Sequence, residues 1–168
     1  MSGEYYVSIM RHAKSDWDAV ARTDFERPLA PRGERDTRRM AKWLSVQAFV
    51  PAQIVSSTAV RAVQTARIVA EALGGIPVTW RDELYLAGLD VLTETLAQPP
   101  ARNWMLVGHN PGLEELVEFC DPQIRARSRF VKLMPTAAIY AFALGPVATP
   151  LAPGCARILA HQRPKLLV

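Results

Sequence analysis

The sequence predicts an α/β fold, with one mostly parallel, open sheet and helices on both of its faces. Short apolar runs of strand length alternate along the chain with amphipathic segments of helical length, and this alternation is typical of parallel strands joined by crossover helices. The chain has 168 residues, of which 49% are hydrophobic and 21% charged, a size and balance that suit one globular domain. We therefore expect a single domain over residues 1–168.

The strands are expected where β-branched and apolar residues cluster, at 5–10, 53–56, 76–80, 104–107, 137–144 and 156–160. The helices are expected between them, at 32–46, 60–73, 90–97 and 113–120. The segment 60–73 has the clearest helical pattern, because its apolar residues recur every three or four positions. The pair Gly74–Gly75 follows its last turn, as is common where a helix ends.

The net charge favours an anionic partner. Lys and Arg number 20 against 16 Asp and Glu, a formal net charge of +4, but the cations are dispersed and no groove-reading motif is present, so we do not expect nucleic-acid binding. The uncharged segment 133–156 is interrupted by prolines and glycines, which excludes one membrane-spanning helix. We expect two buried strands there, joined by a Pro-rich loop, in a cytoplasmic protein that makes no membrane contact.

The cysteines and histidines do not indicate a metal site. Cys120 and Cys155 lack metal-binding spacing, so we expect reduced, buried thiols and no disulfide. The chain has three histidines, and we interpret His161, close to the C-terminus, as structural or solvent-facing. No metal and no cofactor is therefore expected.

Cationic and imidazole side chains follow three of the predicted strands. Arg11 and His12 come directly after the first strand, Arg61 lies at the start of the helix after the second strand, and His109 follows the fourth strand. In open α/β sheets, ligands bind beyond the carboxyl ends of the strands. We therefore expect these two arginines and two histidines to meet at one edge of the sheet.

These four side chains suit a phosphoryl group. A guanidinium can bond two phosphoryl oxygens at once, and the helix that begins near residue 60 adds free backbone N–H groups. A neutral imidazole can attack phosphorus, so we hypothesise that His12 is the nucleophile and that His109 stabilises the equatorial oxygens. Phosphoryl transfer needs chiefly alignment and charge stabilisation, which these residues supply without a metal.

Three motifs resemble the histidine phosphatase superfamily, in its phosphoglycerate-mutase-like branch. They are MRHAKS at 10–15, SSTAVRAVQTA at 56–66 and VGHNPG at 107–112. The segment DFERPLAPRG at 24–33, together with the short chain, resembles the phosphohistidine phosphatases of the SixA type. The resemblance extends over residues 5–112, and its motifs are specific in order and spacing.

The resemblance implies a phosphoglycerate-mutase-like fold and a covalent phosphohistidine intermediate on His12. It implies a phosphate pocket formed by Arg11, His12, Arg61 and His109. By similarity, Arg27 also reaches this pocket, although an ordinary ion pair in a loop would explain it equally well. Lys14 and Ser57 are weaker candidates at the rim, and the Ser57 hydroxyl could instead cap a turn or a helix.

The proton donor is the part of the family pattern that this sequence matches least clearly. Many relatives use a carboxylic acid to protonate the leaving oxygen, and Glu83 falls in the corresponding interval by similarity. A surface ion pair with Arg81 is the alternative interpretation of Glu83, and Asp16 and Asp18 are other candidate acids. An imidazole leaves readily once it is protonated, whereas an alkoxide needs a positioned acid.

The function that the resemblance implies is removal of phosphate from phosphohistidine on a protein, in an open pocket walled by the loops at 14–31 and 81–90. Such a pocket is expected to bind phosphate or sulfate. The runner-up is a phosphatase of the same superfamily that acts on a small phosphomonoester. A mutase is a weaker alternative, because an open pocket excludes water poorly. A non-catalytic phosphoprotein-binding module would not need both imidazoles.

Overall fold

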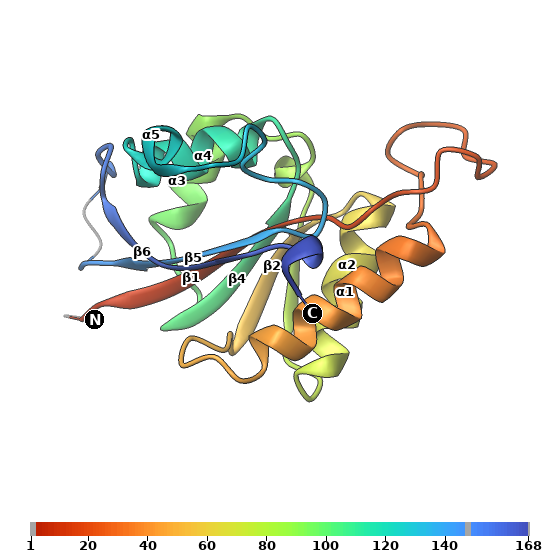
Figure 1. Ribbon diagram of the computed structural model, residues 1–168, viewed down its shortest axis with the longest axis horizontal. Helices are drawn as coiled ribbons and strands as arrows, with labels where there is room; N and C mark the ends of the chain where they lie inside the picture. The colour runs from red at the N-terminus through yellow and green to blue at the C-terminus, as the bar shows by residue number, and fades with distance from the viewer. Residues whose placement is uncertain (1–2, 147–148, 168) are drawn as a thin grey trace.

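One six-stranded sheet forms the centre of the molecule. The computed structural model describes residues 3–146 and 149–167. Along the sheet the strands lie in the order β3, β2, β4, β1, β5, β6 (Figure 1). Their bounds are β1 Tyr5–Arg11, β2 Gln53–Ser57, β3 Val78–Arg81, β4 Asn103–Gly108, β5 Ile139–Leu144 and β6 Ala156–Gln162. The pairings among β1, β2, β3 and β4 are parallel, whereas β5 is antiparallel to both β1 and β6.

Helices cover both faces of the sheet, as the sequence predicts. Figure 1 shows α1 and α2 on one face and α3, α4 and α5 on the other. Their bounds are α1 Pro31–Leu44, α2 Val60–Ala72, α3 Leu89–Leu96, α4 Gly112–Cys120 and α5 Ile124–Arg127. Gly74 and Gly75 follow the end of α2, and both have positive φ, a conformation that glycine adopts without a steric penalty. The predicted fold class is confirmed.

Two hydrophobic cores lie on the two faces of the sheet, and the strands contribute to both. Ile9 and Leu106 pack into the core beneath α3 and α4, while Met10 and Met105 pack into the core beneath α1 and α2. Successive side chains of a strand point to opposite faces. A strand covered on both faces therefore needs a nearly unbroken apolar run, which is why β1 and β4 could be recognised in the sequence.

The C-terminal half differs from the prediction at several points. All of β5 is buried, as expected, but β6 is only half-buried, because it lies at the sheet edge. The expected Pro-rich loop between them includes residues 147–148, which lie outside the described residues. The short helix α5 and the single 3₁₀ turns Asp82–Leu84 and Pro164–Leu166 were not predicted, because segments this short carry no periodic pattern.

Both cysteines are free thiols, but only one of them is buried. Cys120 is buried at the end of α4, whereas Cys155 is half-buried just before β6. The expectation of two buried thiols is therefore wrong for Cys155, because this residue belongs to the edge of the sheet. In the described part of the chain, no helix combines the length and the apolar character that crossing a membrane requires.

The strand register brings the ends of three strands to one level. Arg11 of β1 lies opposite Gly108 of β4, and Ser56 of β2 lies opposite Val107 of β4. The chain therefore leaves these strands at the same edge of the sheet. This is the edge at which open α/β folds bind their ligands.

We predict that Gly112→Ala destabilises the fold at this edge. A Cβ atom at Gly112 would lie 2.1 Å from the backbone oxygen of Ala87. Either α4 or the segment before α3, to which Ala87 belongs, would therefore have to move. Such overpacking costs about 1–3 kcal/mol of unfolding free energy, measurable by denaturant unfolding. Gly145→Ala is the control, since nothing lies within 4 Å of its added Cβ. Equal stabilities of the two variants would contradict the prediction.

Candidate active site

A cavity of about 530 Å³ opens at the carboxyl edge of the strands. Six of the side chains singled out in the sequence line it, namely Arg11, His12, Lys14, Arg27, Arg61 and His109. Ser57 and Glu83 are not among its lining residues. The four strand-end residues expected at one edge of the sheet are therefore brought together in one cavity.

His12 is held with one ring nitrogen fixed and the other facing the cavity. Its side chain follows β1 and the residue is 5% exposed. The Nδ1 atom lies 2.8 Å from the carbonyl oxygen of Ala13, which can only accept, so Nδ1 carries the proton and Nε2 carries the lone pair. The backbone N–H of Ala13 in turn donates to Thr65 Oγ1 at 3.1 Å. Thr65 thus helps to hold the carbonyl that sets the tautomer.

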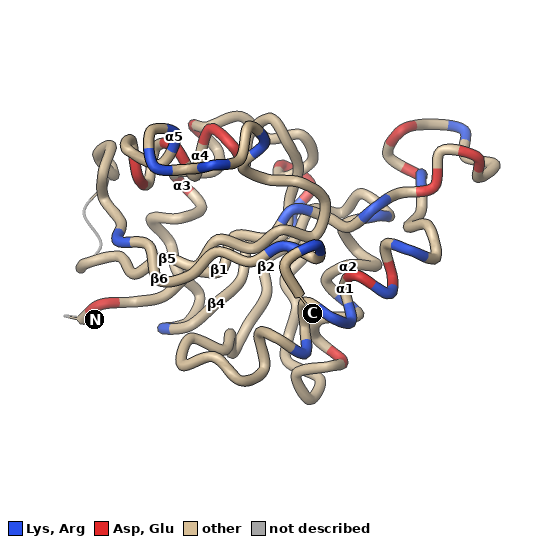
Figure 2. Tube along the Cα trace, viewed as in Figure 1, with Lys and Arg blue, Asp and Glu red and all other residues tan. Residues whose placement is uncertain are grey.

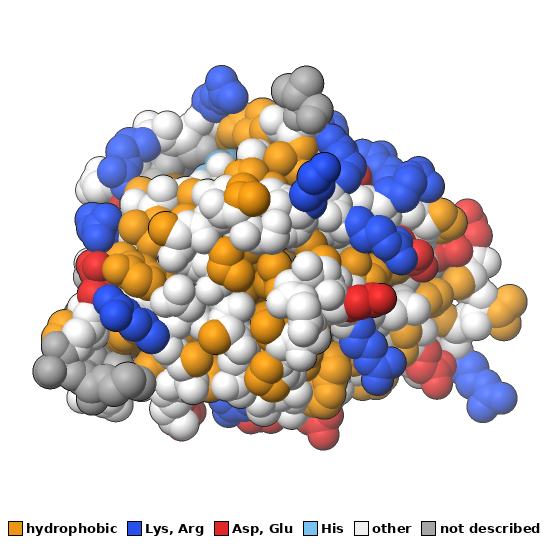
Figure 3. All heavy atoms as spheres, turned by 90° about the horizontal axis from the view of Figure 1, so that it is seen from below, with side chains coloured by type: hydrophobic (Ala, Val, Ile, Leu, Met, Phe, Trp, Pro, Cys, Tyr) orange, Lys and Arg blue, Asp and Glu red, His pale blue; other side chains and the backbone are white. Residues whose placement is uncertain are grey.

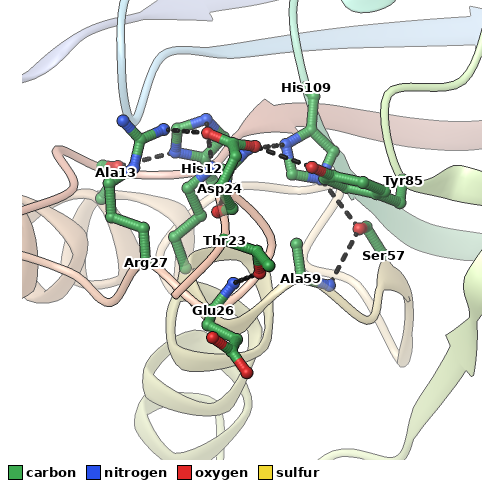
Figure 4. Close-up of polar contacts among 11 residues, drawn as sticks. His12, Ala13, Thr23, Asp24, Glu26, Arg27, Ser57, Ala59, Tyr85 and His109 are labelled. Carbon is green, nitrogen blue, oxygen red and sulfur yellow. Dashed lines mark hydrogen bonds and ion pairs between the residues drawn. The ribbon is translucent and has the colours of Figure 1, made fainter. Parts of the chain in front are cut away.

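His109 has the opposite tautomer. Its Nδ1 lies 3.4 Å from Nη2 of Arg61, which can only donate, so Nε2 carries the proton and donates to Ser57 Oγ at 2.8 Å. The two imidazole rings lie with their centroids 5.1 Å apart. Figure 4 shows Ser57 and Tyr85 beside the ring of His109.

Ser57 is not a rim residue. It is fully buried, and its hydroxyl oxygen accepts two hydrogen bonds, one from Nε2 of His109 and one from the backbone N–H of Ala59 at 3.2 Å. The turn-capping interpretation of Ser57 is therefore the one that its contacts match, since Ala59 precedes α2. The same hydroxyl also positions the second imidazole, which the sequence did not predict. Lys14, by contrast, is exposed at the mouth of the cavity.

Burial keeps both imidazoles neutral. Desolvation lowers the pKa of His12 to about 3, opposed by its hydrogen bond to Ala13 and assisted by the neighbouring His109 and arginines. Desolvation and the charge of Arg61 likewise lower the pKa of His109 to about 3. A buried imidazole beside fixed positive charges loses more by protonation than it would in water. At neutral pH, His12 therefore presents an unprotonated Nε2 to the cavity.

Arg61 joins the two histidines to the loop before α1. It lies in the first turn of α2 and is 2% exposed. Its Nε donates to Nε2 of His12 at 3.3 Å, and its Nη1 and Nη2 donate to the backbone oxygen and the carboxylate of Asp24 at 2.6 and 2.9 Å. Arg11 lies on the other side of the cavity, where its Nη1 donates to the carbonyl of Met134 at 3.1 Å.

Asp24 is a site residue that sequence reasoning did not single out. Its carboxylate accepts hydrogen bonds from Arg27, Arg61 and the Tyr85 hydroxyl at 2.8–2.9 Å. Partial burial would raise the pKa of Asp24, but the Tyr85 hydrogen bond and the charge of Arg61 outweigh it and lower the pKa. The carboxylate is therefore ionised at neutral pH. The available signal was its position three residues before Arg27 in the segment 24–33.

Arg27 reaches the cavity, as the resemblance implies. It is buried, and its Nη2 pairs with Asp24, so the loop ion pair considered as the alternative also exists. Its guanidinium lies 3.4 Å from the ring centroid of Trp17, a residue that is 71% exposed at the rim. Its Nε and Nη1 have no hydrogen-bond partner among the described residues. Two donors of Arg27 are therefore buried and unsatisfied, beside the ring of Trp17.

The structure does not bring Glu83 to the cavity. Its carboxylate pairs with Arg81 at 2.6 Å, and its side chain is 50% exposed. Asp16 and Asp18 do not line the cavity either. The surface ion pair weighed as the alternative for Glu83 is the arrangement observed. Among the described residues, Asp24 is the carboxylate that lines the cavity.

Several other features of the site carry no motif in the sequence. Lys132, Pro135 and Thr136, from the loop before β5, also line the cavity. Asn110 holds this loop in place by donating to the carbonyl of Met134 at 2.9 Å.

His161 lies outside the cavity and stacks on Tyr140, so its interpretation as structural matches its contacts. No group of three or more potential metal ligands occurs within residues 3–146 and 149–167.

Comparisons with known proteins identify the family and the fold that this chain resembles. The family model described as histidine phosphatase superfamily (branch 1) matches residues 7–85. A candidate phosphohistidine phosphatase SixA from Agrobacterium tumefaciens has a structure with a TM-score of 0.79 and 28% sequence identity, over 94% of this chain and 97% of that chain. A structure of the protein histidine phosphatase SixA complexed with tungstate has a TM-score of 0.78 at 24% identity, over 97% and 99% of the two chains, which shows a shared fold.

One relative is longer than the matched region. A chloroplastic protein of Arabidopsis thaliana is 32% identical over 119 residues, which are 64% of this chain. The chain thus spans about half of that protein, since the match covers 55% of its length. The resemblance stated from the motifs is confirmed by the family model and by the SixA structures.

We predict that the two buried imidazoles make the fold sensitive to acid. In the unfolded chain each takes up a proton near pH 6.5, whereas the folded chain resists protonation until about pH 3. The unfolding free energy should therefore fall below pH 6.5, by about 1 kcal/mol per pH unit for each histidine. Denaturant unfolding between pH 6.5 and 5, without phosphate or sulfate, measures this slope. His12→Gln should reduce the slope by the contribution of one histidine, about 1 kcal/mol per pH unit. An unchanged slope would contradict the prediction.

We predict that Asp24→Asn tightens the binding of inorganic phosphate. The carboxylate holds the hydrogen-bond donors of Arg27 and Arg61 that an anion would use, and its side chain is 45% exposed. Removing such a screened charge is worth about 1 kcal/mol, or roughly a fivefold lower Kd by calorimetry. Glu26→Gln, on the same loop, is the control for net charge. Weaker phosphate binding by the Asp24→Asn variant would mean that Asp24 mainly orients the arginines.

Proposed function

We propose that this chain, which the model of the histidine phosphatase superfamily matches over residues 7–85, is a phosphohistidine phosphatase that removes phosphate from protein phosphohistidine. The observation that carries this proposal is the lone pair of His12. Its tautomer is set by Ala13, its pKa is low, and its Nε2 lies in a cavity beside two arginines and a second imidazole. Arg61 Nε donates to this lone pair at 3.3 Å, so it has to turn to a phosphoryl oxygen before the neutral nitrogen can attack.

In the first step, Nε2 of His12 attacks phosphorus while the bond from phosphorus to the substrate imidazole breaks. The leaving imidazole takes a proton from solvent water, and the phosphoryl group is then bound to Nε2. The proton stays on Nδ1, hydrogen-bonded to the carbonyl oxygen of Ala13, and this bond stabilises the positive charge that develops on the ring. In the second step, water attacks phosphorus, the Nε2–P bond breaks, and inorganic phosphate is released with the oxygen of that water.

The cavity supplies the positive charge that the phosphoryl oxygens need. Arg11 and Arg61 line the cavity with His12, and Arg27, whose Nε and Nη1 are buried and unpartnered among the described residues, lines it as well. A bound phosphoryl dianion raises the pKa of a neighbouring imidazole, so His109 becomes a proton-bearing donor on its cavity side as the anion binds. Prearranged donors of this kind are the main source of catalysis in phosphoryl transfer.

The position of the carboxylates favours phosphohistidine over a phosphoester. Asp24 is ionised, and Glu83 is exposed and paired with Arg81. Neither is therefore a protonated acid pointing at a leaving group. An alkoxide depends on such an acid, whereas a histidine side chain needs a weaker proton source to leave. The runner-up, hydrolysis of a small phosphomonoester, would require Glu83 to move into the cavity.

We predict that His12→Ala abolishes phosphate release from a histidine-phosphorylated protein. Without Nε2 no phosphoenzyme forms, so the rate should fall by at least ~10³-fold, the loss typical of removing a nucleophile. Phosphate release is measured with EDTA present, and the phosphoenzyme is trapped by rapid quench at alkaline pH. Wild type should release phosphate faster from this substrate than from p-nitrophenyl phosphate.

The Glu83→Gln variant separates the two candidate substrates. Phosphohistidine hydrolysis should be unaffected, because Glu83 does not line the cavity. A preference of wild type for the ester, lost in Glu83→Gln, would move the proposal to a small-molecule phosphatase. Tight phosphopeptide binding without a phosphoenzyme would identify a binding module instead.

A further inference from the structure

A second cavity adjoins the active-site cavity. It has a volume of about 270 Å³ and lies between the start of α1, the loop before β5 and the C-terminal turn at 164–166. Three residues of the loop, Lys132, Pro135 and Thr136, line both cavities. The two hollows therefore form one groove that leads away from His12 across the surface.

The accessible side chains of this groove are mainly cationic. Lys14, Lys132 and Lys165 are exposed and form no ion pair with the described residues, and Arg32 is 63% exposed and only loosely paired, at 3.5 Å, with Asp36. We call these four residues the basic groove. In Figure 3, Lys and Arg side chains gather over α1 at one end of the face shown, where Figure 2 places several cations of α1 beside the C-terminal segment.

The opposite rim of the active-site cavity has the other sign. The loop at 16–26, of which Trp17 and Asp24 line the cavity, carries four carboxylates, Asp16, Asp18, Asp24 and Glu26, against one cation, Arg22, and Figure 2 shows acidic positions on the loop that projects from the molecule. The mouth is thus polarised, with carboxylates on the projecting loop and free lysines on the side of α1 and the C-terminal turn. A polarised mouth orients a charged partner as well as attracting it.

We propose that the basic groove binds an acidic segment of the phosphoprotein, on one side of its phosphohistidine. This inference rests on the proposed function and names the substrate class of the same site. The groove begins at Lys132, on the wall of the catalytic cavity, so a chain whose phosphohistidine faces His12 passes over it. Carboxylates on that chain would meet the three lysines that have no acidic partner in the described residues.

A peptide fits this groove better than a nucleic acid does. Binding of single strands relies on aromatic side chains on which successive bases stack. None of the residues that line the adjoining cavity is aromatic, and Trp17, in the catalytic cavity, already stacks on Arg27. The lysines are dispersed point charges, which suit flexible carboxylates.

The test uses three synthetic peptides that carry one phosphohistidine, prepared with phosphoramidate and flanked on one side by four Glu, four Gln or four Lys. The readout is the ratio of kcat/KM for the Glu peptide to that for the Gln peptide. We expect a ratio of about 10 for wild type at low salt, the lower end of electrostatic steering effects, and a ratio near 1 at high salt. The Lys peptide should be the slowest.

Charge-reversal variants test whether the preference for the Glu peptide arises at the basic groove. Lys132→Glu/Lys165→Glu should lower the ratio to 1 or less, and Lys132→Gln/Lys165→Gln should lower it about half-way on a logarithmic scale. Lys42→Glu/Arg67→Glu makes the same change in net charge at exposed positions outside the groove, so it should keep most of the ratio. Equal losses in the groove and control variants would overturn the inference, because the effect would then come from net charge alone.

Two further outcomes are distinguishable. Equal wild-type rates on all three peptides would overturn the basic groove while leaving the proposed function intact. No hydrolysis of any peptide, and no phosphoenzyme from phosphoramidate itself, would overturn the proposed function. Inhibition by poly(U) that exceeds inhibition by polyglutamate, and that Lys132→Glu/Lys165→Glu removes, would assign the groove to nucleic acid.

Discussion

The parallel pairing of β4 with β1 on one side and β2 on the other is the constraint on which the site depends. Its register places Arg11 opposite Gly108 and Ser56 opposite Val107, so the chain leaves three strands at the same level. Two imidazoles and the groups that orient them emerge there from backbone held on both sides by sheet hydrogen bonds. Their 5.1 Å separation is therefore a property of the sheet, and functional groups placed by strands are held more closely than groups on loops.

Desolvation determines the protonation state of the two imidazoles. A buried imidazole beside arginines stays neutral, and the partner of its first nitrogen decides which nitrogen keeps the lone pair. Here the partners are the carbonyl of Ala13 and the hydroxyl of Ser57, neither of which carries a formal charge. A carboxylate in the place of the Ala13 carbonyl would favour the imidazolium. The neutral carbonyl raises the pKa of His12 too little to outweigh desolvation, so burial keeps the ring neutral. Ala13 also donates its backbone N–H to Thr65 of α2, so the packing of this helix helps to hold the carbonyl in place.

The sequence predicted the parts of the site that strands and a long helix place. Arg11, His12 and His109 stand directly after apolar runs, so their common edge followed from the periodicity of the chain. Asp24 and Lys132 could not be placed in this way, because each lies in a loop whose path depends on distant contacts, such as the hydrogen bonds to the carbonyl of Met134. The family pattern suggested a carboxylate at Glu83, yet the 3₁₀ turn that holds this residue directs it to Arg81 and solvent.

Asp24 explains how so many cations can share one small cavity. Its carboxylate forms ion pairs with both Arg27 and Arg61. Without this carboxylate the two guanidinium groups would repel each other in a site that is partly shielded from water. Under the proposed function, a substrate phosphoryl group has to replace this counter-charge to reach the same guanidinium nitrogens. A dianion carries twice the charge of the carboxylate that it displaces, whereas a monoanion brings no more than Asp24 already provides. The site is therefore selective by charge before any side chain recognises the remainder of the substrate, and recognition of that remainder falls to the surface around the cavity mouth.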